Sequence, residues 1–126
     1  MEADVRGKVL CVEDNQDDCD LVKEILGDFD VTCVSTIEKA CGLLDETKYV
    51  LILIDEHLPD GSGLSLCGKI SDKNADTPVL MVSGDAYLTN AEVVRCGAKA
   101  LLTKSKINYV DELRLFARHY ATSAGV

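Results

Sequence analysis

The chain has 126 residues, the length of one ordinary domain, and with 47% hydrophobic and 28% charged residues its composition is typical of a globular protein rather than a disordered one. Its formal net charge of −9 would repel nucleic acid and anionic membranes, so direct nucleic-acid binding is disfavoured. The longest apolar run, residues 50–54, is far short of a membrane span, and the start lacks a signal peptide's apolar region, so we expect a soluble, cytoplasmic protein.

We expect residues 1–126 to form one domain with a core from about residue 8 to residue 120. The chain carries six cysteines without CxxC spacing, and most of them fall at apolar positions of periodic segments. Reduced core residues are therefore favoured over disulfides or a metal site. The six are Cys11, Cys19, Cys33, Cys41, Cys67 and Cys96.

Five short apolar runs predict strands. They are continuous rather than alternating, which is typical of strands covered on both faces, as in a parallel sheet. In chain order they span residues 9–12, 31–34, 50–54, 79–82 and 100–102.

Helical patterns follow each predicted strand. The first has an apolar stripe at Leu21, Val22, Ile25 and Leu26, and the second has one at Ile37, Ala40, Cys41 and Leu44. The third, about residues 64–71, is the least periodic. The last spans about residues 109–120, and its expected inner face is Val110, Leu113, Phe116, Ala117 and Tyr120.

Helix ends are also marked in the sequence. Ser35 with Glu38, and Thr89 with Glu92, have the spacing of a capping box, and Gly97 is expected to close the fourth helix. The strict alternation of strand and helix predicts an α/β fold with right-handed crossovers and a doubly wound five-stranded parallel sheet. Ligands of such a sheet bind beyond the carboxyl ends of the strands.

Polar residues follow four of the predicted strands: Glu13 and Asp14, then Asp55, then Ser83, then Lys104. Each has a structural explanation when taken alone, as a helix cap, a turn or a surface lysine, whereas their joint occurrence in order points to a shared site. Three converging carboxylates repel one another unless a cation offsets them, and Mg²⁺ is the natural candidate.

A carboxylate beside Mg²⁺ can act as a nucleophile towards a phosphoryl group, which makes Asp55 a plausible phosphoacceptor. Lys104 would supply a second positive charge, and the Ser83 hydroxyl would donate a hydrogen bond.

These segments resemble those of the response-regulator receiver domains of two-component phosphorelay systems. The resemblance runs from Lys8 to Tyr120, and only the combination of segments is specific. The segments are residues 12–15 (VEDN), 55–63 (DEHLPDGSG), 82–84 (VSG), 96–98 (CGA) and 102–104 (LTK).

The resemblance implies the flavodoxin-like (βα)5 receiver fold and a signalling phosphoacceptor that is not an enzyme, although it assists its own phosphotransfer and dephosphorylation. By that similarity Asp55 takes a phosphoryl group from the phosphohistidine of a histidine kinase or phosphotransfer protein. Asp14, Asp55 and the backbone carbonyl of His57 would hold Mg²⁺, with Glu13 acting through bound water. Ser83 and Lys104 would hold the phosphoryl oxygens.

The turn after Asp55 fits this role. Residues 58–61 (LPDG) are expected to form it, with Pro59 fixing φ and Gly61 permitting a positive φ.

The chain departs from the family pattern at two places. Ser105 stands where the family has a proline after its lysine, so we expect a trans Lys104–Ser105 peptide, because a cis bond there would cost about 2.5–4 kcal/mol. Leu101 stands where the family has its switch aromatic, so the usual coupling between serine and aromatic cannot operate in its standard form, and Tyr87 is a candidate substitute.

By the same resemblance, His57 and Asp85 occupy two flanking positions that tune dephosphorylation in this family. We hypothesise that they interact across the mouth of the site.

The output surface implied by the resemblance is the face of the fourth helix, fifth strand and fifth helix. Its candidate residues are Tyr87, Leu88, Lys106, Ile107, Tyr109, Arg114 and Arg118.

Four interpretations remain open at this point. The first is a stand-alone receiver that acts on an unknown downstream protein, and the second is a receiver excised from a larger regulator or hybrid kinase. The third is a phosphorylation-independent pseudo-receiver, suggested by Leu101 and Ser105. The fourth, a small α/β enzyme or flavin carrier, is disfavoured because Glu13 and Asp14 would repel a phosphate.

Overall fold

The computed structural model describes residues 6–73, 76–84 and 87–121. A parallel five-stranded sheet forms its centre, with the strand order β2-β1-β3-β6-β7. The strands are β1 (Lys8–Val12), β2 (Asp30–Val34), β3 (Leu51–Asp55), β6 (Val79–Ser83) and β7 (Ala100–Thr103). The predicted doubly wound flavodoxin-like sheet is therefore confirmed, and each predicted strand lies within one residue of its observed bounds.

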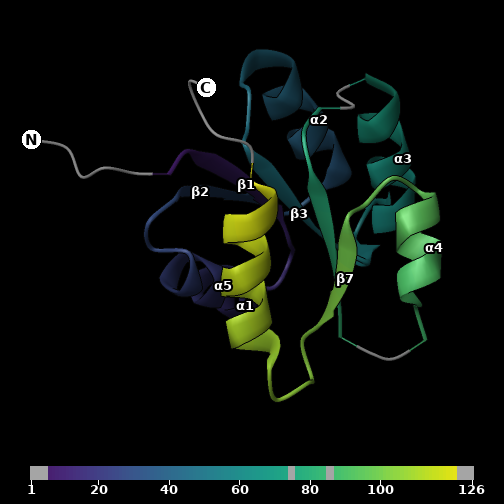
Figure 1. The fold of residues 1–126 in the computed structure, drawn as a ribbon. Coiled ribbons are helices and arrows are strands. Elements are labelled where there is room, and N and C mark those ends of the chain that lie inside the picture. The colour runs from purple at the N-terminus through teal and green to yellow at the C-terminus, as the bar shows by residue number, and fades with distance from the viewer. Residues whose placement is uncertain (1–5, 74–75, 85–86, 122–126) are drawn as a thin grey trace, which may run out of the picture.

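Among the described residues, five helices cover the two faces of this sheet (Figure 1). They are α1 (Gln16–Ile25), α2 (Ile37–Glu46), α3 (Gly63–Lys73), α4 (Asn90–Arg95) and α5 (Tyr109–Tyr120). Residues of α1 and α5 pack with alternate strand residues such as Val9 and Leu53 in one core cluster. Residues of α2, α3 and α4 pack with the intervening strand residues, such as Leu10 and Ile52, in the other. The strand order reverses at β1 and β3, which places the topological switch point between these two strands.

A short hairpin follows β3, formed by the antiparallel strands β4 (His57–Leu58) and β5 (Gly61–Ser62). The predicted turn lies between them, and Gly61 has a φ of 152°, which confirms the expected need for a positive φ. The Asp60 carboxylate in this turn accepts hydrogen bonds from the backbone N–H groups of Ile37 (2.9 Å) and Glu38 (3.1 Å) at the start of α2. The hairpin is thereby attached to the neighbouring helix.

The predicted helix ends are confirmed at α4 and wrong at α2. Thr89 and Glu92 form the expected capping box, and Gly97 adopts a positive φ just beyond the end of α4. At α2, however, Thr36 rather than Ser35 is the N-cap, and its hydroxyl accepts the backbone N–H of Lys39. The two residues are adjacent and chemically equivalent as caps, so the spacing alone could not separate them.

Three predictions about packing need correction. Val110 is exposed, and Tyr109 packs into the core in its place, while the other four residues of the predicted inner face of α5 pack on the core as expected. Leu21 on α1 is exposed as well, while its predicted neighbours Val22 and Ile25 are buried. All six cysteines are free thiols, but Cys33, Cys41 and Cys96 are only half-buried.

Candidate functional site

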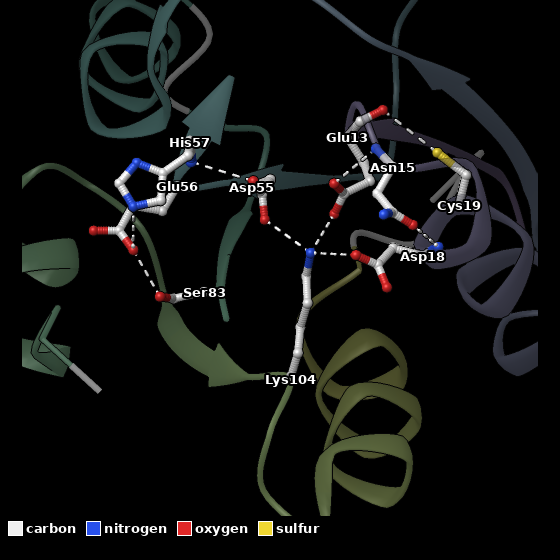
Figure 2. A network of polar contacts seen from close by, with 9 residues as sticks. All are labelled: Glu13, Asn15, Asp18, Cys19, Asp55, Glu56, His57, Ser83 and Lys104. Atoms are coloured by element: carbon white, nitrogen blue, oxygen red, sulfur yellow. Dashed lines mark hydrogen bonds and ion pairs between the residues drawn. The ribbon is translucent and has the colours of Figure 1, made fainter. Parts of the chain in front are cut away.

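Four predicted site residues lie at the carboxyl ends of the parallel strands, as Figure 2 shows: Glu13, Asp55, Ser83 and Lys104. Asp55 is the last residue of β3, and Glu13 directly follows β1, so these two carboxylates face one another across the switch point. Lys104 follows β7 and extends its side chain towards both. The strand ends thus bring together residues that are separated by up to 91 positions in the sequence.

Lys104 contacts three carboxylates. Its Nζ lies 2.6 Å from Glu13 Oε1, 2.7 Å from Asp18 Oδ2 and 3.0 Å from Asp55 Oδ1. Burial alone would lower the pKa of Lys104, but its hydrogen bonds to Asp18, Glu13 and Asp55 outweigh burial and raise that pKa above its usual value. The ammonium group is therefore held charged beside Asp55.

Glu13 is the most buried carboxylate of the site, with 6% of its surface exposed. Burial raises the pKa of its carboxyl above the usual value, and the negative charge of Asp55 acts in the same direction. Lys104 lowers that pKa but does not cancel the increase. Its Oε2 also accepts the backbone N–H of Asn15 at 3.2 Å, and Asn15 in turn caps α1 by accepting the N–H of Asp18. The start of α1 thus fixes Glu13 and Asp18 relative to Lys104.

Three carboxylates gather into one acidic cluster. Glu13, Asp14 and Asp55 can each offer an oxygen within 4.8 Å of the other two, and Asp14 is the exposed member. Hard carboxylate oxygens at this spacing, open to water on one side, suit Mg²⁺, which is held by few carboxylates and keeps several waters. The donor set therefore fits the metal that the sequence predicts.

Ser83, the last residue of β6, is completely buried, and its hydroxyl donates a 2.6 Å hydrogen bond to Glu56 Oε1. The same Glu56 oxygen lies 3.6 Å from Nε2 of His57, whose side chain is exposed (Figure 2). The backbone N–H of His57 donates to Asp55 Oδ2 at 3.2 Å. The hypothesised contact of His57 with Asp85 cannot be followed, because Asp85 lies outside the described residues.

Sequence reasoning missed two residues of this site, Asp18 and Glu56. Asp18 lies not at a strand end but in the first turn of α1, where an acidic residue is ordinary and did not indicate the site. Glu56 directly follows Asp55, where a strand residue would alternate away from the site. Its side chain reaches the end of β6 instead.

The two departures from the family pattern both have structural counterparts. The Lys104–Ser105 peptide is trans, as predicted, since no cis peptide occurs in the described part of the chain. Leu101 is half-buried in β7 against the core that includes α4, and its backbone N–H donates to Asn90 Oδ1 at 3.1 Å. A direct link therefore joins the start of α4 to β7 at the position of the missing aromatic.

The predicted output residues divide into exposed and buried ones. Tyr87 is 89% exposed and Ile107 fully exposed, and Lys106, Arg114 and Arg118 also lie at the surface. Leu88 and Tyr109 are buried, so their placement on a contact surface was wrong: their apolar side chains pack into the core instead.

Comparison with known proteins agrees with this geometry. The family model of the response regulator receiver domain matches residues 9–114. The response regulator protein PilR of Pseudomonas aeruginosa is 35% identical over 102 residues, covering 79% of this chain and 23% of that protein. The regulatory protein VanR of Enterococcus faecium is 29% identical over 124 residues, covering 94% of this chain and 53% of that protein.

A solved structure, the receiver domain of the Francisella response regulator 1452, aligns with a TM-score of 0.81 at 26% identity, covering 90% of this chain and 95% of that one. The chain spans only 23% and 53% of the lengths of PilR and VanR, so it corresponds to one part of those proteins. The acidic cluster, the lysine and the fold together agree with the family match: this chain belongs to the response regulator receiver domains, the phosphoacceptor domains of two-component systems.

Proposed function

We propose that Asp55 is the phosphoacceptor and that it takes its phosphoryl group from a phosphohistidine of a histidine kinase or a histidine phosphotransfer protein. The observation that carries this proposal is the contact of Asp55 with Lys104 at 3.0 Å inside the acidic cluster. The carboxylate lies at the end of a buried strand with 11% of its side chain exposed, and a charged ammonium lies beside it. That combination favours attack on phosphorus over simple structural pairing.

In this proposal a carboxylate oxygen of Asp55 forms the new bond to phosphorus, and the bond from phosphorus to the imidazole nitrogen breaks, with its electron pair leaving on the histidine. Lys104 then interacts with a phosphoryl oxygen, and the Ser83 hydroxyl donates to another. The His57 N–H, which donates to Asp55 Oδ2, orients the carboxylate. Preorganised charges of this kind are the main source of catalysis in phosphoryl transfer.

Glu13, Asp14, Asp55 and the backbone carbonyl of His57 would hold Mg²⁺. When bound, the metal neutralises charge on the phosphoryl oxygens. Glu13 and Asp55 already share the positive charge of Lys104, so the site has a second cationic group that can adjust when the phosphoryl group arrives.

We further propose that phosphorylation changes protein contacts through the face of α4, β7 and α5. Leu101 and Ser105 make its switch non-standard, and its exposed members are Tyr87, Lys106, Ile107, Arg114 and Arg118. The partner is a downstream protein rather than nucleic acid, which fits the net charge of −9. We expect one domain acting in the cytoplasm, either alone or as part of a longer regulator.

Intact-mass spectrometry after incubation with a small acyl phosphate, with and without Mg²⁺, tests this function. The natural protein should gain one phosphoryl group only when Mg²⁺ is present, and Asp55→Asn should gain none. No gain under any condition would support the phosphorylation-independent module instead. Equal gain by Asp55→Asn would place the acceptor elsewhere.

A further inference from the structure

Glu56 has a fixed backbone and a side chain directed into the site. Its backbone N–H donates to the carbonyl of Val82 (2.9 Å), and its carbonyl accepts the N–H of Gly63 (2.8 Å). These two bonds attach Glu56 to the end of β6 and to the start of α3. Its side chain is 16% exposed, so the carboxylate lies largely out of water.

The hydroxyl of Ser83 donates a hydrogen bond to the carboxylate of Glu56 at 2.6 Å, as Figure 2 shows. A hydrogen bond to a charged acceptor at this length is stronger than one between neutral groups. Lys104, the nearby ammonium, lies against Glu13, Asp18 and Asp55 instead. The charge of Glu56 is therefore stabilised in large part by the hydroxyl of Ser83.

A serine hydroxyl has one proton to donate. It cannot donate fully to Glu56 and to a phosphoryl oxygen on Asp55 at the same time. A phosphoryl group would also bring negative charge next to the Glu56 carboxylate, which adjoins Asp55 in the chain. Ser83 and Glu56 must therefore separate when the site is phosphorylated, and a largely buried carboxylate that loses its donor turns towards water.

We propose that Glu56 is a positioning residue that sequesters the Ser83 hydroxyl in the unphosphorylated protein, and that release of Ser83 from Glu56 accompanies phosphorylation of Asp55. This inference rests on the proposed function. The Glu56 side chain would then be the group that moves on phosphorylation, at a site where Leu101 stands in place of the family's switch aromatic. Glu56 leads directly into the β4–β5 hairpin, whose Asp60 caps α2, so its movement would be transmitted to that hairpin and helix.

The test is the initial rate of phosphoryl gain from a small acyl phosphate with Mg²⁺, followed by intact mass. Glu56→Ala removes the charged acceptor from the Ser83 hydroxyl and should raise the rate about tenfold, the value of one hydrogen bond to a charged group. Glu56→Gln keeps an acceptor without the charge and should give an intermediate rate. Glu24→Ala, which removes an exposed carboxylate from α1, is the matched control and should leave the rate unchanged.

The same Glu56 substitutions are then made in a Ser83→Ala protein, which separates sequestration from charge repulsion. Sequestration predicts that Glu56→Ala changes the rate less than about twofold there, because no hydroxyl remains to be released. An equal acceleration in both backgrounds would mean that Glu56 acts only by its negative charge, and the inference would be wrong.

The outcomes also separate this inference from the proposed function. If the natural protein gains a phosphoryl group and both Glu56 variants react at its rate, the inference fails while the function stands. If the natural protein gains none, the function fails and the inference falls with it. Urea unfolding of each variant shows that the proteins compared are folded.

Discussion

Replacing Gly63 with alanine should displace the backbone of Asp55, because Gly63 begins α3 directly against the end of β3. A Cβ atom at this position would lie 3.0 Å from the carbonyl carbon of Asp55 and 3.0 Å from Cγ2 of Ile54, and closer still to the carbonyl oxygen of Asp55. Non-bonded carbon atoms normally lie about 3.5–4.0 Å apart. Since the nearest atoms belong to the backbone, either the strand end or the helix start must move.

The cost of this movement can be estimated. Overpacking of a close-fitting position costs about 1–3 kcal/mol. Weakening the bond from the Gly63 N–H to the Glu56 carbonyl adds about 1 kcal/mol. The free energy of unfolding should therefore fall by about 2–4 kcal/mol, which lowers the urea midpoint by roughly 2 M for an m value of about 1.5 kcal/mol/M.

Gly68→Ala in the same helix is the matched control. A Cβ there meets nothing within 4 Å, so the substitution should stabilise the protein by up to about 1 kcal/mol through helix propensity. Gly63→Ala should also slow phosphoryl gain, because the carbonyl that must move belongs to Asp55. A Gly63→Ala protein with the urea midpoint and the phosphoryl gain of the natural protein would show that the close packing of Gly63 against Asp55 does not matter for stability or for the site.

Three further predictions concern charge and reactivity. Lys104→Met leaves three carboxylates without their shared cation, so the free energy of unfolding at pH 7 should fall by about 3 kcal/mol. Burial raises the pKa of Glu13, so the deficit should be smaller at pH 5; a deficit independent of pH in urea unfolding would contradict this. Hydrogen bonds from the start of α2 lower the pKa of Asp60 in the folded state. The stabilisation by Asp60 therefore exists above its unfolded pKa and is lost as the pH falls through its folded pKa. Asp60→Ala should have a lower free energy of unfolding than the natural protein at pH 7, and the two free energies should converge below about pH 4. Hydrogen bonds from the neighbouring thiols, that of Cys11 first, lower the pKa of Cys33 to about 6. Iodoacetamide at pH 7 should therefore alkylate Cys33 before the similarly half-buried Cys41 and Cys96. Peptide mapping that finds either of those two modified first would contradict a thiolate at Cys33.

The strands and the site rim could be predicted because each follows from a local pattern. A strand buried on both faces must be apolar throughout, so the runs around Leu10 and Leu53 identify the sheet directly. Polar residues at the carboxyl ends of such strands then share one edge by topology. Asp55, Glu13 and Lys104 were placed together on this argument, and they lie together in the structure.

The remaining features depend on choices that the sequence leaves nearly equal. Tyr109 and Val110 are both apolar, so the helical period alone could not decide which of them faces the core. Asp18 and Glu56 belong to the site through the direction of their side chains. That direction depends on Lys104 and Ser83, which are distant in the chain.

In the proposed function, Asp55 itself carries the phosphoryl group. Borohydride reduces an aspartyl phosphate to homoserine, so treatment of the phosphorylated protein, followed by peptide mass spectrometry, identifies the acceptor. We expect homoserine at position 55 only, and only after incubation with acyl phosphate and Mg²⁺. An unmodified Asp55 in a protein that has gained a phosphoryl group, or reduction at Glu56 or Asp14 instead, would contradict it.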